Sequence, residues 1–362
     1  MVTRFLKKST ALFAASLLSA GVLASCTTST DTAETTTDTA AESTEADAGE
    51  EVAVEGGEAC APEVTELTFG IISTESQANQ APIWEPFITA MSEGLGREVE
   101  AQYSTEYAAI IEAMGADKVQ IAWFGGKSYI EAAKRSQAEA FARTVAGDGS
   151  TGYFSHLITN KENPIVEEVD VDAGNGDEYV IENAADLSFA FNEENSTSGF
   201  LVPTYYVFAQ NGVNAEDIFS ELTYAGTHEA TALAVANEQV DVATNNSESL
   251  DRLAETAPEE REKIQVIWTS PEIPSDPLAM RNDLPDCLKE EIKDFFYNYT
   301  DETVLGPLAW SGFEPAADAD WNTIRELEIA KNKLQVESDD TLSAEEKQAQ
   351  IEELDQELEA LQ

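Results

Sequence analysis

Short apolar runs alternate with longer segments, in which apolar residues recur at helical spacing, along residues 67–268. The short runs predict β-strands and the longer segments predict helices, such as Ile83–Leu95, Glu106–Ala116 and Glu229–Glu238. The predicted strands are Leu67–Ile72, Glu98–Tyr103, Val119–Phe124, Phe154–Thr159, Leu187–Phe191, Leu222–Ala225, Val240–Thr244 and Ile264–Trp268. This alternation predicts an α/β fold with mainly parallel sheets covered by helices.

The pattern changes after Trp321, where apolar residues keep a helical spacing to the end of the chain. Two helices are predicted there, Thr323–Val336 and Ser343–Leu361, and the second begins with a capping signal, Ser343-Ala344-Glu345-Glu346. Residues 322–362 are therefore expected to form a helical tail. Packing of this tail on its own lobe and pairing with a second copy as a homodimer both fit the pattern, and both stay open.

The first residues have the pattern of an export signal. Three basic residues, Arg4, Lys7 and Lys8, precede an apolar run at residues 11–24. This run is too short to span a membrane. Leu23-Ala24-Ser25-Cys26 resembles a bacterial lipobox, which predicts removal of residues 1–25 and a lipid on Cys26. Plain secretion with cleavage near Ala24 is the alternative, and it stays open.

The segment that follows, residues 26–59, is rich in Thr, Asp, Glu and Ala and has almost nothing to bury. It predicts a disordered acidic tether between the lipid and the folded body. We therefore expect an exported protein, anchored to the cytoplasmic membrane through lipid and facing the periplasm or the cell exterior.

The chain is strongly acidic, with 20 Lys and Arg against 70 Asp and Glu and a formal net charge of −50. Such a surface excludes a nucleic-acid partner, because neutralising phosphates requires clustered Lys and Arg. It also disfavours acidic lipid surfaces. A high-salt habitat would screen this charge, and a bias of the lineage explains it equally well.

Two cysteines remain after Cys26, and in an exported chain Cys60 and Cys287 can pair as a disulfide or stay as free thiols. No metal site is expected, because His156 and His228 lack ligands at metal-binding spacing. Residues 170–182 are acidic and glycine-rich but do not match a calcium loop, and they predict a solvated hairpin insertion. No cofactor is expected either.

The most informative string is Asn195-Ser196-Thr197-Ser198-Gly199-Phe200-Leu201, between a predicted strand and a helix-like run at residues 203–210. A helix N-terminus exposes unpaired N–H groups and about half a positive charge, so added hydroxyl donors make a pocket for an oxyanion. Ser and Thr are also ordinary helix caps. Spacing alone leaves capping and anion binding open.

Other polar residues follow predicted strands in the same way: Tyr107, His228, Asn246, Ser247, Glu248 and Asp276. In sheets with parallel strands, ligands bind beyond the carboxyl ends of the strands. Each residue alone fits a cap or a turn. Together they can line one cleft.

The chain resembles one family through motifs spread from about Leu67 to Glu314. The motifs are Tyr107-Ala108-Ala109-Ile110-Ile111-Glu112, Ile121-Ala122-Trp123-Phe124-Gly125, Gly152-Tyr153-Phe154-Ser155, the string from Asn195 to Pro203, and the run from Ala232 to Asn246. They are similar to those of the periplasmic phosphonate-binding component of ABC importers.

The resemblance implies a two-lobed class II solute-binding fold that closes on its ligand and delivers it to ABC permease subunits. It divides the chain into lobe 1 (60–158 and 268–321) and lobe 2 (159–267). It also implies a set of phosphonate contacts: Tyr107, Tyr153, Ser196, Thr197, Ser198 and His228. In members that bind an aminoalkylphosphonate, two carboxylates hold the ammonium, and these correspond to Glu248 and Asp276.

The expected function is thus capture of a phosphonate, with 2-aminoethylphosphonate as the best match to the two carboxylates. A binder of phosphite, methylphosphonate or phosphate in the same fold is the alternative. A phosphoester hydrolase is more remote, because Ser196 has no evident base partner and no metal cluster is expected. We therefore expect no catalytic residues. A scaffold lipoprotein without a small ligand is a third class.

Overall fold

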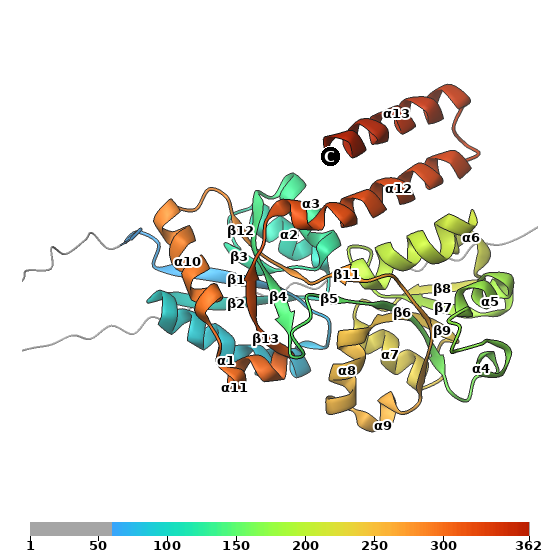
Figure 1. The fold of residues 1–362 in the computed structure, drawn as a ribbon, viewed down its shortest axis with the longest axis horizontal. Helices are drawn as coiled ribbons and strands as arrows, with labels where there is room; N and C mark the ends of the chain where they lie inside the picture. Colours follow the sequence, from blue (N-terminus) through green and yellow to red (C-terminus); the bar gives the residue numbers. More distant parts are fainter. Residues whose placement is uncertain (1–59, 362) are drawn as a thin grey trace, which may run out of the picture. The chain divides into compact units, whose positions relative to one another are not determined.

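The computed structural model describes residues 60–361. The expected signal peptide, Cys26 and the tether lie outside the described residues. The described chain forms two lobes, each built on its own β-sheet with helices packed against it (Figure 1). The expected two-lobed α/β architecture with a C-terminal helical segment is confirmed.

The first sheet has six strands in the order β13-β4-β12-β3-β1-β2. Its strands are β1 (Glu66–Ile72), β2 (Glu98–Ser104), β3 (Ile121–Trp123), β4 (Ala138–Ala146), β12 (Pro277–Arg281) and β13 (Trp310–Pro315). Strands β1, β2 and β3 pair in parallel, whereas β12 pairs antiparallel with β3 and β4, and β13 pairs antiparallel with β4. The helices that contact this sheet are α1 (Gln77–Leu95), α2 (Tyr107–Gly115), α3 (Gly126–Arg135), α10 (Asp286–Asn298) and α11 (Glu302–Leu305).

The second sheet has five strands in the order β10-β6-β9-β7-β8. Its strands are β6 (Ser155–Asn160), β7 (Ser188–Phe191), β8 (Glu221–Tyr224), β9 (Val242–Asn246) and β10 (Ile264–Thr269). Pairs β7–β8 and β7–β9 are parallel, and pairs β6–β9 and β6–β10 are antiparallel. The helices of this lobe are α4 (Ile165–Glu168), α5 (Gly176–Glu182), α6 (Ala215–Ile218), α7 (His228–Ala236), α8 (Ser247–Thr256), α9 (Pro258–Arg261) and two π-helical segments, Thr197–Leu201 and Thr204–Phe208.

Both sheets are mixed, so the expectation of mainly parallel sheets is wrong in detail. In the first sheet the antiparallel pairings involve β4, β12 and β13, which the apolar pattern did not predict as strands. Strand β4 is rich in alanine, which has low strand propensity, and burial of Ala140, Phe141 and Ala142 outweighs that preference. Strand β12 starts at Pro277 within a stretch that resembles a turn, yet all of its residues are buried.

The chain crosses between the lobes twice, and the crossing segments pair with each other as β5 (Gly152–Tyr153) and β11 (Ile273–Pro274). The expected boundaries at 158/159 and 267/268 fall inside β6 and β10, so the crossings lie a few residues outside them. Residues 170–182 are also not a solvated hairpin. They end in α5, whose Val180 is fully buried.

The core of each lobe is rich in aromatic side chains. In the first lobe, Phe87 packs against Phe296 and Phe313 with ring centroids 5.7 and 5.6 Å apart. In the second lobe, Phe189 packs against Phe191 and Phe219 at 4.9 and 4.7 Å. Such pairs add to the stabilisation from apolar burial, so each sheet has a well-packed foundation for the loops at its ends.

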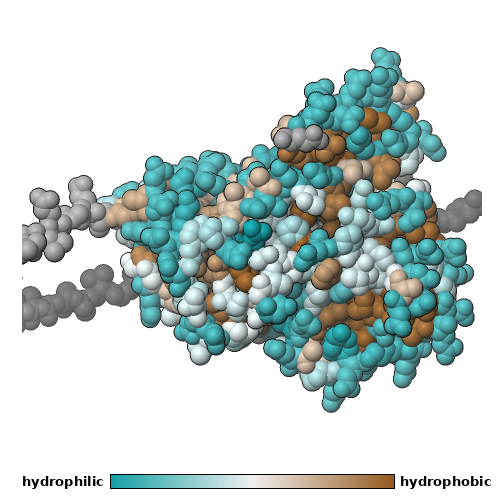
Figure 2. Space-filling view, in the orientation of Figure 1, coloured by the Kyte–Doolittle hydropathy of each residue, from teal (hydrophilic) through white to brown (hydrophobic). Residues whose placement is uncertain are grey.

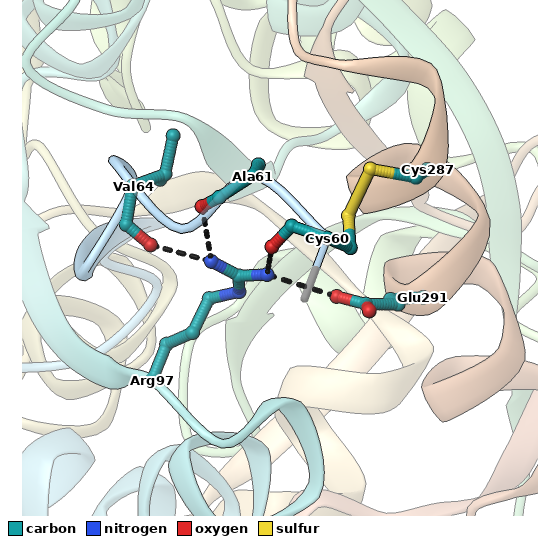
Figure 3. The surroundings of a disulfide bond; sticks show 6 residues. All are labelled: Cys60, Ala61, Val64, Arg97, Cys287 and Glu291. Carbon is teal, nitrogen blue, oxygen red and sulfur yellow. Dashed lines mark hydrogen bonds and ion pairs between the residues drawn. A yellow bond between two sulfur atoms is a disulfide. The ribbon is translucent and has the colours of Figure 1, made fainter. Parts of the chain in front are cut away.

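A disulfide joins the start of the described chain to α10 (Figure 3). Cys60 and Cys287 are bonded, with their Cα atoms 5.8 Å apart. Arg97 reinforces this junction, because its guanidinium donates to the carbonyls of Cys60, Ala61 and Val64. Glu291 of α10 pairs with the same guanidinium at 3.0 Å. The beginning of the folded body is thus held to the first lobe by covalent and charged contacts.

The chain ends in a helical hairpin, α12 (Asn322–Ser338) and α13 (Ala344–Ala360), which extends from the body (Figure 1). Helix α12 contacts α3 of the first lobe and both π-helical segments of the second lobe. Figure 2 shows mostly hydrophilic residues on the visible face, with hydrophobic ones where the hairpin meets the body and in further patches on the body below it. No helix within residues 60–361 is long and apolar enough to cross a membrane.

Candidate functional site

The Ser-Thr-Ser string lies where the chain leaves β7 and enters the π-helical segment Thr197–Leu201. Ser196, Thr197 and Ser198, called the hydroxyl triplet below, are each about 2 % exposed. Gly199 follows because a Cβ at that position would collide with the side chain of Asn192. The string therefore packs tightly against the end of its own strand, with its polar side chains buried.

Each hydroxyl of the triplet accepts a hydrogen bond from a different protein group. These bonds run from Gly199 N to Ser196 Oγ (3.0 Å), from Lys127 N to Thr197 Oγ1 (2.9 Å) and from Asn246 Nδ2 to Ser198 Oγ (3.1 Å). Ser196 is thus a helix cap, so the capping interpretation holds for this residue. Because a hydroxyl also carries one hydrogen, each residue of the triplet can still donate, to a neighbouring group such as the Tyr153 hydroxyl or to an anion.

Burial keeps the other candidate anion contacts neutral. Burial raises the pKa of the Tyr107 and Tyr153 hydroxyls well above the usual range, and nearby carboxylates raise both further. Burial, together with the charge of Arg252, lowers the pKa of His228 to about 3. His228 Nε2 lies 3.5 Å from Ser198 Oγ. At neutral pH these side chains are therefore uncharged groups that can donate hydrogen bonds.

The two candidate carboxylates lie beside this group of donors. Burial, and then the charge of Glu248, raises the pKa of Asp276 well above its usual range. Burial also raises the pKa of Glu248, and Arg252 offsets part of that increase. Asp276 Oδ1 is buried and has no hydrogen-bond partner among residues 60–361. Two desolvated carboxylates are costly to keep ionised side by side unless a cation joins them.

Tyr153 connects the two groups. Its hydroxyl interacts with Thr197 and Ser198 of the triplet, and it also senses the charges of Asp276 and Glu248. The charge of Asp276 also acts on Tyr107, and His228 contacts Ser198. The candidate residues of the donor group and the two carboxylates are therefore linked by contacts or by charge. No group of three or more His, Cys, Asp or Glu suited to a metal ion is found within the described residues.

Contacts between the lobes surround the site. The Lys127 N–Thr197 bond joins α3 of the first lobe to the triplet of the second. Arg252 of α8 pairs with Glu75, just after β1, at 2.6 Å, and these side chains are only 13 % and 14 % exposed. Such bonds can form only when the lobes are together, so the structure represents a closed arrangement.

A third contact between the lobes comes from Glu229 in the first turn of α7. Its carboxylate accepts from Ser76 N at 2.6 Å and from the side chain of Asn79, while its own N–H donates to Thr74 O. A carboxylate at the start of α1 also complements the positive end of that helix. The loop between β1 and α1 is thus held from the second lobe at several points.

Sequence reasoning missed several residues of this site. Arg252 lies one helical turn after Glu248, a spacing that places the two on one face of α8. Asn192 directly follows β7, is fully buried, and has no partner for either amide atom among residues 60–361. Asn246 was noted among the residues that follow strands, but its contact with the triplet could not be read from spacing.

Comparison with known proteins identifies the family. A sequence model described as "ABC transporter, phosphonate, periplasmic substrate-binding protein" matches residues 69–321. The chain is 45% identical to the phosphonates-binding periplasmic protein of Escherichia coli K12 over 299 residues, which cover 82% of this chain and 85% of that protein. The chain belongs to the periplasmic phosphonate-binding family of ABC transporters. It is a substrate-binding component and not an enzyme, which sets aside the hydrolase interpretation.

Solved structures agree with this assignment. A binding-protein component of an ABC phosphonate transporter from Pseudomonas aeruginosa superposes with a TM-score of 0.75 at 44% identity, covering 82% of this chain and 96% of that one. A more distant relative, 24% identical over 283 residues, is the phosphate-import protein PhnD of Mycolicibacterium smegmatis, with 72% of this chain and 84% of that protein covered. The motifs noted in the sequence thus belong to this family.

Proposed function

We propose that this periplasmic protein captures an aminoalkylphosphonate, with 2-aminoethylphosphonate as the best match, and presents it to the permease of its ABC importer. The hydroxyl triplet, Tyr107, Tyr153 and His228 hold the phosphonate oxygens. Glu248 and Asp276 hold the ammonium. One observation carries the proposal. Two buried carboxylates, Glu248 and Asp276, lie beside a group of hydrogen-bond donors that are all uncharged.

The chemistry of the two groups supports this orientation. None of the proposed phosphonate contacts is Lys or Arg, so a phosphonate is held by oriented O–H and N–H groups, which select its geometry. Arg252 acts on both Glu248 and Asp276, but it is also paired with Glu75, and burial still raises the pKa of both carboxyls. An ammonium between Glu248 and Asp276 adds positive charge that offsets this cost. A zwitterionic ligand therefore relieves the cost of burying charge at both ends.

The alternative ligand is phosphite, methylphosphonate or phosphate. The name of the Mycolicibacterium relative, which refers to phosphate import, favours keeping it as a candidate. Without an ammonium, however, Glu248 and Asp276 would both face an anion, or one of them would have to take up a proton. This cost is why the aminoalkylphosphonate is the better match.

Calorimetry with matched ligands tests the proposal. We expect 2-aminoethylphosphonate to bind at least tenfold more tightly than ethylphosphonate, because each charge-assisted hydrogen bond contributes about 1.5–3 kcal/mol. Methylphosphonate, phosphite and phosphate complete the series. Equal affinities for the amino and non-amino ligands would contradict an ammonium site. Tightest binding of phosphate or phosphite would favour the alternative.

Two further features of the chain belong to this proposal. The lipobox resemblance at residues 23–26 supports acylation of Cys26. Mass spectrometry of protein extracted from the membrane tests this, and the variant Cys26→Ala is the control. Helix α12 packs on the body with Ile324 and Ile329 buried, whereas α13 has no buried residues, and we keep a homodimer through the hairpin as a proposal. Sedimentation of the full chain against a variant ending at Asp339 tests this, and a monomer for both would contradict it.

A further inference from the structure

Asn246, the last residue of β9, has an amide group whose orientation is fixed. Its Oδ1 accepts from Ser249 N at 2.7 Å and so caps the N-terminus of α8. Because this oxygen faces the helix, the Nδ2 group must face the other way. The side chain is 5 % exposed, so it has little freedom to turn.

The Nδ2 group of Asn246 has two close neighbours. Ser198 Oγ lies at 3.1 Å and His228 Nε2 at 3.2 Å. An amide nitrogen has two hydrogens and cannot accept, so both neighbours must act as acceptors toward it. Ser198 Oγ also lies 3.5 Å from His228 Nε2. Donation from Ser198 across this longer contact would compete with Asn246 for the single lone pair of Nε2.

This arrangement determines where the protons of the two neighbours are. His228 is neutral at physiological pH, and a neutral imidazole carries one ring proton. If Nε2 accepts, that proton is on Nδ1, which is buried and has no partner among residues 60–361. Ser198 accepts from Asn246, so its own hydrogen is left to donate, either to the neighbouring Tyr153 hydroxyl or to a bound oxyanion.

We propose that Asn246 is a positioning residue: it orients Ser198 Oγ–H to donate to the bound oxyanion, and it holds the single ring proton of His228 on Nδ1, the nitrogen that has no partner among residues 60–361 and is left to donate. The inference rests on the proposed function, because it assumes that these two side chains contact the ligand. Asn246 thereby donates to the hydroxyl of Ser198 as Lys127 N donates to the hydroxyl of Thr197. In addition, Asn246 determines the tautomer of His228. This end of the site then presents donors alone, which favours fully deprotonated ligand oxygens over a P–OH group.

The tautomer can be read without any ligand. The chain has two histidines, so nitrogen-15 NMR of histidine-labelled protein gives two ring systems, and His156→Gln assigns them. We expect His228 to carry its proton on Nδ1 in the wild type. In Asn246→Asp the carboxylate still caps α8 but now accepts, so the proton should move to Nε2. An Nε2–H tautomer in the wild type would overturn the inference.

Binding supplies the second readout, by calorimetry with methylphosphonate and 2-aminoethylphosphonate. We expect Asn246→Asp to weaken both ligands by about a hundredfold or more, because two donors are turned away from the anion. Ser247→Asp places the same charge one residue away, where a carboxylate can still accept from Phe154 N as Ser247 Oγ does, so it measures the effect of the added charge without a change at Asn246. Asn246→Ser keeps a cap without adding charge, and it should give mixed tautomers with a loss of about tenfold.

The two readouts separate this inference from the proposed function. If the wild type binds no phosphonate but His228 is an Nδ1–H tautomer that Asn246→Asp reverses, the proposed ligand fails while the control of the tautomer stands. The positioning role is refuted if phosphonates bind, if Asn246→Asp and Ser247→Asp lose the same amount of affinity, and if the tautomer of His228 is the same in both variants as in the wild type. A tautomer change accompanied by a larger loss in Asn246→Asp supports it.

Discussion

The two ends of the candidate site differ in charge: one consists of uncharged hydrogen-bond donors and the other of two buried carboxylates. The donor end, comprising the hydroxyl triplet, Tyr107, Tyr153 and His228, contains neutral groups, and every hydroxyl of the triplet already accepts a bond from the protein. The acid end, comprising Glu248 and Asp276, contains two desolvated carboxylates, one of which has an oxygen without a partner among residues 60–361.

This difference indicates which end decides the choice of ligand. The donor end is oriented by backbone and cap bonds and is ready for an anion before any ligand arrives, so it should serve many phosphorus oxyanions. The acid end is unfavourable by itself, because burial and then neighbouring carboxylates raise both pKa values, and Arg252 offsets only part of the increase. A cationic group removes that penalty, so discrimination between ligands should depend on the acid end.

The largest expected effect is a pH dependence of opposite sign at the two ends. His228 has a pKa lowered to about 3 by burial, so between about pH 6.5 and 3 the unfolded chain binds the extra proton. The stability from neutral His228 is thus present above about pH 6.5 and is lost as the pH falls, by roughly 1.4 kcal/mol per pH unit. Urea unfolding should show a shallower acid decline in His228→Asn.

Asp276 should act in the other direction. Its folded-state pKa is raised, so its favourable contribution is present below about pH 3.9 and is lost as the pH rises through the folded value. Asp276→Asn should therefore remove this loss, so that between about pH 3.9 and 6.5, where both groups act, the stability of the variant rises more steeply with pH than that of the wild type. Identical pH profiles for wild type, His228→Asn and Asp276→Asn would show that the two ends do not differ in this way.

Parts of the fold with strong local patterns could be predicted from the sequence, and parts held by distant contacts could not. Strands β1 and β7 are apolar runs, so their presence follows from composition. Strand β4 has weak local preference and forms because two antiparallel neighbours bury it. Strand direction likewise depends on the crossings between lobes, which the alternation of strands and helices does not encode.

The same division applies to the site. The hydroxyl triplet was predicted because three hydroxyls and a glycine lie together in the sequence. The bond from Lys127 N to Thr197 joins residues 70 positions apart, and the contact between Asn246 and His228 joins residues 18 positions apart. Such contacts depend on how the lobes and strands meet, so one sequence without relatives gives no signal for them.

The second prediction concerns the acid end. The double variant Glu248→Gln, Asp276→Asn should remove most of the preference for 2-aminoethylphosphonate over ethylphosphonate, because it removes two charge-assisted bonds worth about 1.5–3 kcal/mol each. Affinity for ethylphosphonate should stay the same or increase, because repulsion of the anion is reduced. Calorimetry of both ligands measures the gap. If the double variant leaves the difference in affinity between the two ligands unchanged, residues other than Glu248 and Asp276 determine the selectivity.

The third prediction concerns the donor end. Thr197→Ala and Ser198→Ala should each weaken binding by about 1–3 kcal/mol, the cost of leaving a buried charged oxygen without its donor. The loss should be the same for amino and non-amino phosphonates, because these side chains act on the shared group. Thermal unfolding without ligand verifies that each variant folds. A loss confined to the amino ligand would contradict the division between the two ends.

The smallest expected effect concerns the contact that brings the ends together. Glu75→Gln weakens the ion pair with Arg252 and so lowers the population of the closed state. Every ligand should then bind about fivefold more weakly, a change of about 1 kcal/mol. Glu291→Gln, which weakens the pair with Arg97 inside the first lobe, is the matched control and should leave binding unchanged.

Small-angle scattering supplies an independent measure of closure. A ligand that touches both lobes favours the closed state by its difference in affinity for the two states, so wild-type protein should have a smaller radius of gyration at saturation. In Glu75→Gln we expect more ligand to be needed for the same change, with the same endpoint. If Glu75→Gln instead alters the preference between amino and non-amino ligands, the Glu75–Arg252 pair belongs to the acid end and acts on selectivity rather than on closure.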